Sequence, residues 1–188
     1  MALHVLESES LAALVNRSTG ISAQKCYQCG KCSAGCPAAV GMDIAPNVVM
    51  RLLQVGTESA DQKLLCSYSI WLCLACHTCD MRCPMEIDLP GIIDVLRSES
   101  LRRGAVNPRA RDIVAFHKSF IDNVRLFGRM WEIGLIGEYK VRTRHFLQDI
   151  LLAPSMLVKR KLSLWPGLHG RLVSRIFSRG PGRLEKTR

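Results

Sequence analysis

The sequence predicts a mainly α-helical protein in which helices surround two cysteine-rich loops and a basic helical extension follows. Three observations predict this fold class. Eight of the nine cysteines lie in two twelve-residue stretches, 26–37 and 73–84. A segment with helical apolar spacing and an early proline follows each stretch, and no segment shows an equally clear strand pattern. Positive charge is concentrated after residue 100.

Both cysteine-rich stretches have the spacing C-x2-C-x2-C-x3-C-P. The first reads CYQCGKCSAGCP and the second, 47 residues later, reads CLACHTCDMRCP. Only the four cysteines and the proline agree between them, so the repeated feature is a set of ligands and a chain-breaking residue. The candidate metal ligands are Cys26, Cys29, Cys32, Cys36, Cys73, Cys76, Cys79 and Cys83.

Three kinds of site use closely spaced thiols. Disulfides belong to oxidising compartments, but the first ten residues, MALHVLESES, show no secretory signal, and nine cysteines are an odd number. Structural zinc sites usually combine two separated pairs of ligands, whereas here four thiols share one tight loop. The observed spacing is that of bacterial ferredoxins, so the sequence favours two [4Fe–4S] clusters, and it predicts no catalytic residue.

The ferredoxin spacing also predicts which thiols share a cluster. Three thiols of one run hold a cluster, and the fourth ligates the other cluster when two runs are present. The first cluster is then expected to take Cys26, Cys29, Cys32 and Cys83. The second is expected to take Cys73, Cys76, Cys79 and Cys36.

Four helical segments are expected around these loops. Residues 8–16 predict a short helix capped by Ser8 or Ser10. Residues 43–56 predict a helix with Pro46 in its first turn, ended by Gly56, and residues 63–80 predict a helix leading into the second loop. The range 88–104 repeats the proline-started pattern. The apolar faces expected of the two proline-started helices are Val48, Val49, Leu52 and Leu53, and Ile92, Ile93 and Leu96.

The extension starts at Asn107-Pro108, a suitable helix start. Apolar residues then recur at helical spacing through about Met130, and a less regular helical pattern reaches Lys161. The residues of this stripe are Ile113, Phe116, Phe120, Val124 and Phe127. The tail 162–188 lacks periodicity and predicts an extended basic arm.

Several single residues carry weaker expectations. Cys66 lies outside both runs and is interpreted as a buried, small apolar side chain, with a redox or ligand role as the alternative. His77 either hydrogen-bonds a cluster sulfur or faces outward. Lys31 and Arg82 could bias a nearby cluster electrostatically. Packing, rather than electron relay, is expected of Tyr27, Phe116, Phe120, Phe127 and Trp131.

Charge divides the chain unevenly. Residues 1–100 hold seven Lys and Arg against ten Asp and Glu, whereas residues 101–188 hold 19 against six. Without base-stacking aromatics, the basic half favours docking to an acidic protein partner or a solvated surface over nucleic-acid binding. No run of apolar residues is long enough for a transmembrane helix, and a reduced cytoplasm is the expected location.

The chain resembles the C subunit of heterodisulfide reductase. The resemblance rests on the two cysteine runs and on AFHKSFIDNVRLFGRMWEIGLIGEYKVRTRHFLQDI with LVKRKLSLWPGLHG, and it covers roughly residues 20–176. It implies a helical ferredoxin-type domain that is the electron-transfer subunit of an oxidoreductase complex. The implied partners are a B-type subunit with CCG domains and an A-type flavin subunit. In sulfur-oxidising relatives a lipoate-binding protein presents the sulfur substrate, so a role in sulfur metabolism is a further implication.

Other functions remain open at this point. One alternative is the iron–sulfur subunit of a succinate, fumarate or glycerol-3-phosphate dehydrogenase, and another is a free ferredoxin-like carrier. Only 25 residues precede Cys26, too few for a [2Fe–2S] domain, and no CCG domain follows Cys83. The expected division of the chain is a short N-terminal helix, the two-cluster domain, a helical extension and a basic arm, at residues 1–20, 21–104, 105–161 and 162–188.

Overall fold

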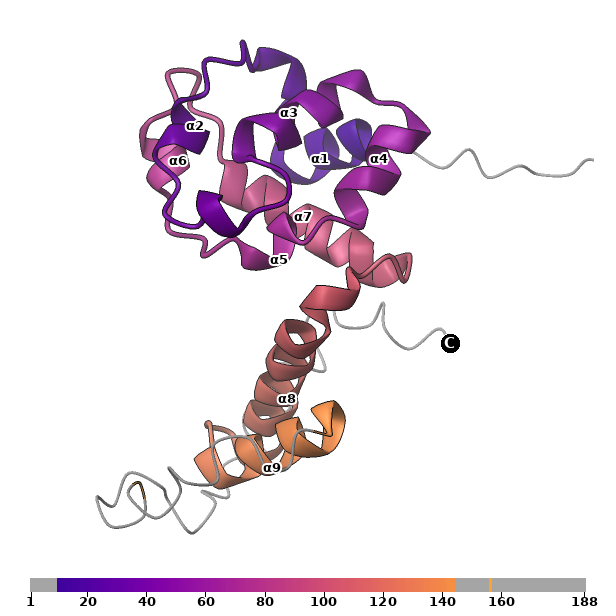
Figure 1. Ribbon diagram of the computed structural model, residues 1–188, viewed down its shortest axis with the longest axis vertical. Helices are drawn as coiled ribbons and strands as arrows, with labels where there is room; N and C mark the ends of the chain where they lie inside the picture. The colour runs from indigo at the N-terminus through magenta and orange to yellow at the C-terminus, as the bar shows by residue number, and fades with distance from the viewer. Residues whose placement is uncertain (1–9, 145–155, 157–188) are drawn as a thin grey trace, which may run out of the picture. The chain divides into compact units, whose positions relative to one another are not determined.

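The fold is known from a computed structural model that describes residues 10–144 and 156, and every regular element among them is a helix (Figure 1). This confirms the predicted mainly α-helical class. The chain divides into two compact units, Met1–Ala110 and Arg111–Arg188. Each unit is described by itself below.

The first unit contains the two cysteine runs. Its α-helices are α1 (Leu11–Thr19), α2 (Lys31–Ala34), α3 (Pro46–Val55), α4 (Glu58–Leu65), α5 (Ser69–Leu72), α6 (Thr78–Met81) and α7 (Leu89–Arg102). Three 3-10 turns accompany them, Ala23–Lys25, Ala39–Gly41 and Pro108–Ala110. Helix α7 packs against α1, α4 and α5, so it forms the centre of the core. The fully buried large side chains are Leu11, Val15, Val49, Leu53, Leu64, Leu65, Ile70, Ile92 and Leu96.

Helix α1 begins where its cap predicts. Ser10 Oγ accepts a hydrogen bond from the N–H of Ala13 at 3.3 Å, which confirms this residue as the N-cap. The helix extends to Thr19, beyond the predicted end, because Gly20 supplies the left-handed conformation that terminates it. The alternative cap, Ser8, lies outside the described residues.

The two proline-started helices form as predicted. Helix α3 begins at Pro46 and ends before Gly56, which has a φ of 61°. Helix α7 is capped by Asp88, whose Oδ1 accepts from the N–H of Gly91 at 3.0 Å, and its predicted apolar face is buried. The predicted core-facing side of α3 is partly wrong. Val48 was expected in the core but is 37 % exposed, and Met50 is buried in the core instead.

The single helix predicted over 63–80 is wrong, because parts of three helices, α4, α5 and α6, with breaks between them occupy this region. Helix α4 already starts at Glu58, where Thr57 Oγ1 accepts from the N–H of Ala60, and it ends at Leu65. Helix α5 starts only at Ser69 and ends before the second cysteine loop. The break between α4 and α5 is held by a residue that lies far away in the sequence, Asp43.

Asp43 ties the segment after the first run to the segment before the second. Its carboxylate accepts from the N–H groups of Tyr68 and Ser69 at 2.9 Å and from the hydroxyls of Ser67 and Ser69 at 2.9 and 2.6 Å. Partial burial alone would raise the pKa of Asp43, but the hydrogen bonds from Ser69, Tyr68 and Ser67 outweigh it and lower the pKa to about 2. The two cysteine loops are therefore held in register by one ionised side chain.

Replacing Asp43 with asparagine should lower the free energy of unfolding by about 1 kcal/mol, after allowance for the solvent screening of an exposed carboxylate. The stabilisation is fully present above the ordinary pKa of 3.8 and is lost as pH falls through about 2. The difference should therefore stay constant from about pH 5 to about pH 8 in anaerobic denaturant unfolding. Asp94→Asn, at a mostly exposed position, is the matched control with a smaller effect. A difference that changes within this pH range would contradict the assignment.

The second unit is described for helices α8 (Arg111–Phe127) and α9 (Glu132–Thr143), which pack against each other. Asn123 is buried and its Oδ1 accepts from the N–H of Trp131 at 2.7 Å, which fixes the turn between them. A side chain at Gly134, in the first turn of α9, would overlap the Trp131 ring, so the close packing of this ring needs glycine there. The predicted packing of the aromatic stripe is only partly correct. Phe127 and Phe116 contact Trp131 and Tyr139 edge-on, but Phe116 and Phe120 are exposed.

The predicted arm at 162–188 lies outside the described residues, as do 145–155 and 157–161 of the helical extension.

Candidate metal centres

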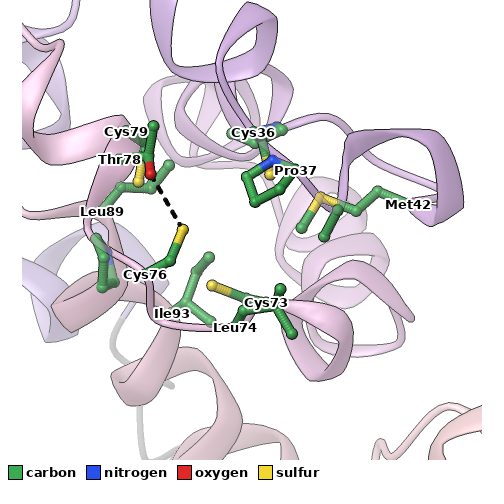
Figure 2. Close-up of a pocket in the computed structure, with 13 residues that line it drawn as sticks. Cys36, Pro37, Met42, Cys73, Leu74, Cys76, Thr78, Cys79, Leu89 and Ile93 are labelled. Carbon is green, nitrogen blue, oxygen red and sulfur yellow. Dashed lines mark hydrogen bonds between the residues drawn. The ribbon is translucent and has the colours of Figure 1, made fainter.

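One cavity of the first unit collects thiols from both cysteine runs. Cys36 of the first run faces Cys73, Cys76 and Cys79 of the second, and Figure 2 shows their sulfur atoms directed into the same space. The space is partly open to solvent. Its remaining walls are mostly apolar and consist of Pro37, Ala38, Met42, Pro46, Leu74, Thr78, Leu89, Pro90 and Ile93.

A second cavity collects the other four predicted ligands. Cys26, Cys29, Cys32 and Cys83 line this space together with Gln28, Lys31, Asn47, Met50 and Ile87. Cys79 and Leu89 line both cavities, so the two spaces are neighbours. The first cavity is therefore lined by three thiols of the second run and one of the first, and the second cavity by three thiols of the first run and two of the second, Cys79 and Cys83.

The two loops repeat their backbone as well as their cysteines. Gln28 and Gly30 of the first run have φ values of 62° and 77°, and the residues 47 positions later, Ala75 and His77, have 49° and 57°. The second left-handed residue of each pair leads directly into α2 or α6. Left-handed residues in such loops turn successive N–H groups toward one side, an arrangement that suits an anionic cluster.

Helices α2 and α6 lie side by side and bring the ends of the two runs together (Figure 1). The guanidinium of Arg82 packs over Gly35, where a Cβ atom would lie 2.6 Å from Nη1. Gly35 and Arg82 occupy equivalent positions of the two runs, each directly before the fourth cysteine. Arg82 and Lys31 line a shallow surface pocket and are both exposed, so solvent screens the charges that the sequence suggested as cluster-biasing groups.

The thiols differ in their readiness to ionise. Burial raises the pKa of Cys79 to about 11 and also raises the pKa of Cys32. Hydrogen bonding to Thr78, whose Oγ1 lies 3.4 Å from the sulfur, lowers the pKa of Cys76 (Figure 2). Because a metal binds thiolates, occupation of these cavities must release the protons of the half-buried thiols Cys32 and Cys79.

Comparison with known proteins agrees with this donor set. The 4Fe-4S dicluster domain family matches residues 22–87, which contain all eight thiols of the two runs. The iron–sulfur C subunit of the CoB–CoM heterodisulfide reductase of Methanopyrus kandleri is 28 % identical over 109 residues, 58 % of this chain and 55 % of that protein. The C subunit of the ferredoxin:CoB–CoM heterodisulfide reductase of Methanosarcina acetivorans is 33 % identical over 103 residues, 52 % of this chain and 40 % of that protein.

The chain is similar to heterodisulfide reductase C subunits. Its cofactors are two [4Fe–4S] clusters. The chain spans about half the length of the curated relatives that it matches. Among the described residues, no helix has the length and apolar character required to cross a membrane.

The residues that line the two cavities fit the clusters. Each cavity offers the four thiols that a [4Fe–4S] cluster requires, and the other polar side chains on the walls are Thr78 in one and Gln28, Lys31 and Asn47 in the other. Apolar walls also limit solvent access, which is one of the factors that set a cluster's reduction potential.

Three single-residue expectations can be compared with the structure. The buried interpretation of Cys66 is wrong, because this residue is exposed at the end of α4, where Gln62 Nε2 donates to its sulfur at 3.3 Å. His77 is exposed and its Nδ1 lies 3.3 Å from Asp80 Oδ2. Tyr27 is 59 % exposed, so its predicted packing role is also wrong.

Two functional residues were missed by the sequence analysis. Gln54 of α3 and Arg97 of α7 each donate to the backbone carbonyl of the first cysteine of a run, Cys26 and Cys73. The only signal in the sequence is that both are the ninth residue of a proline-started helix.

Proposed function

We propose that this chain is the electron-transfer subunit of a heterodisulfide reductase-like complex and relays single electrons between a flavin subunit of the A type and a CCG-domain subunit of the B type. The observation that carries the proposal is the pair of neighbouring thiol-lined cavities, which share Cys79 and Leu89 and together contain all eight thiols of the two runs. Four thiols at each site leave no iron open to a substrate, which suits relay better than turnover. The names of the relatives supply the type of complex.

The proposed ligands follow the lining of the cavities. The first cluster takes Cys26, Cys29, Cys32 and Cys83, and the second takes Cys73, Cys76, Cys79 and Cys36. When bound, each cluster accepts and returns one electron at a time. The chain supplies the thiolates, excludes water with apolar walls such as Leu89 and Ile93, and holds both loops in register through Asp43.

The proposed organisation of the chain retains the four parts predicted from the sequence, with the two-cluster domain at 21–104 as the redox part. The basic residues after 100 are proposed to dock an acidic surface of a partner subunit. The chain is proposed to work in the cytoplasm, and a lipoate-binding protein would be reached through the complex if its substrate is carrier-bound sulfur.

The test begins with the anaerobically purified chain, which should contain about eight irons and about eight acid-labile sulfides. The flavin subunit, reduced by its own donor, should then bleach the visible cluster absorbance of this chain. Addition of the oxidised CCG-domain subunit should restore that absorbance. Stoichiometric zinc without visible absorbance would refute the clusters themselves.

The control is the same mixture without this chain, in which electrons should reach the CCG-domain subunit much more slowly. Equal rates with and without the chain would contradict a relay role while leaving the clusters in place. Sustained thiol production by the isolated chain would instead identify it as a catalyst. Formation of the complex by gel filtration separately tests whether these partners bind at all.

A further inference from the structure

The first cysteine of each run is anchored through its backbone carbonyl. Gln54 Nε2 donates to the carbonyls of Cys26 and Ala23 at 2.6 and 3.1 Å. Arg97 donates through Nη2 to the carbonyl of Cys73 at 2.6 Å and through Nε to that of Ile70 at 2.5 Å. The two pairs of carbonyls are related by the same 47-residue offset as the cysteine runs.

The anchors are equivalent in position but differ in charge. Each is the ninth residue of the helix that follows its run, α3 or α7. Gln54 is neutral, whereas the guanidinium of Arg97 is always charged. The chain therefore places a permanent cation at the start of the second loop and none at the matching position of the first.

The Arg97 charge is poorly neutralised by its surroundings. The side chain is only 18 % exposed, and its carboxylate partner Asp94, at 3.0 Å, is 67 % exposed. An exposed carboxylate is well screened by solvent and salt, so it offsets only part of the field of a mostly buried cation. Lys31 also lines the cavity of the first cluster, but both Lys31 and Arg82 are exposed, so solvent screens their charges more strongly than that of Arg97.

We propose that Arg97 is a positioning residue whose charge also gives the cluster of the 73–79 loop the higher reduction potential of the two. This inference rests on the proposed function and its ligand assignment. Reduction adds one electron to a cluster and makes it more negative, so a nearby fixed cation stabilises the reduced form. An electron shared between the two clusters then resides mainly on the one held by Cys73, Cys76, Cys79 and Cys36.

The test is an anaerobic redox titration of the isolated, cluster-loaded chain, followed by electron paramagnetic resonance. Arg97→Gln copies the neutral anchor of the first loop. This substitution should lower the reduction potential of the cluster that is reduced first and leave the potential of the other cluster unchanged. The equilibrium constant for sharing one electron between the clusters then falls on the order of tenfold. Arg97→Lys, which keeps the charge but loses the fork of donors, should leave the cluster that is reduced first close to its original potential.

A purely structural anchor gives a different pattern. Equal shifts in Arg97→Gln and Arg97→Lys, no shift in either, or a shift in the potential of the cluster that is reduced second would each overturn the proposal. If Arg97→Gln loses a cluster, Asp94→Asn tests the role of the Arg97 charge instead. This variant removes only the exposed counter-charge and leaves both contacts of Arg97 with the backbone carbonyls in place. Asp94→Asn should raise the reduction potential of the cluster held by the 73–79 loop, and an unchanged potential in this variant would also overturn the proposal.

Failure of this inference is distinguishable from failure of the proposed function. The potentials are measured on the isolated chain at equilibrium, whereas the relay is tested with partner subunits present. A chain that relays electrons but shows no dependence on the charge at position 97 contradicts only the role of Arg97. A chain with fewer than two clusters contradicts the proposed function before any potential is measured.

Discussion

Replacing Cys36 with serine should remove the cluster held by the 73–79 loop and leave the other cluster in place. Cys36 lines the same cavity as Cys73, Cys76 and Cys79, although it belongs to the first run. A serine hydroxyl is a much poorer ligand for iron than a thiolate, so iron should fall from about eight to about four atoms per chain.

Alkylation under anaerobic conditions, followed by mass spectrometry, identifies which cluster is lost. In Cys36→Ser the thiols of Cys73, Cys76 and Cys79 should become reactive, while those of the first run remain protected. Cys66→Ser is the matched control, because that thiol is exposed outside both cavities and its replacement should leave iron content unchanged. New reactivity at Cys26 and Cys29 instead would show that each run binds its own cluster.

The largest effect on stability is expected at the centre of the helical core. Leu96 of α7 is fully buried where this helix packs against α1, α4 and α5. Its replacement by alanine removes buried apolar surface and leaves a cavity, which should cost about 2–5 kcal/mol of the free energy of unfolding. The loss is measured as a shift of the midpoint in anaerobic guanidinium unfolding, followed by helix circular dichroism.

Leu101→Ala provides the control on the same helix. Leu101 is 51 % exposed, so the same chemical change should alter stability by no more than about 0.5 kcal/mol. Similar losses in the two variants would show that α7 is not the centre of this core. Unchanged iron content in both variants at low denaturant is expected, since neither leucine lines a thiol cavity.

The sequence was sufficient for features that depend on local chemistry. Proline at the start of α3, a capping aspartate before α7 and the left-handed glycine after α3 each act within a few residues, so the bounds of these helices were predictable. The spacing of the cysteines likewise identified the type of cofactor. Thr57 is a similar local signal for the start of α4, although the predicted range 63–80 does not include it.

Features that depend on distant residues were not predictable. The break between α4 and α5 exists because Asp43 binds N–H groups of Tyr68 and Ser69, 25 and 26 residues later in the chain. Local periodicity continues through that break and therefore predicts one helix. The same limit applies to Gln54 and Arg97, whose role depends on carbonyls 28 and 24 residues away.

The matched left-handed positions of the two loops have a consequence for the maturation of the protein. Gly30 adopts its φ of 77° at little cost, whereas His77 holds a φ of 57° that disfavours a residue with a Cβ atom by roughly 1 kcal/mol. The other left-handed pair, Gln28 and Ala75, carries a side chain in both loops and creates no such difference. Before any iron arrives, the first loop is thus closer to its final shape. Cluster delivery is then expected to begin at residues 26–32, and the second loop completes its fold as its own cluster is inserted.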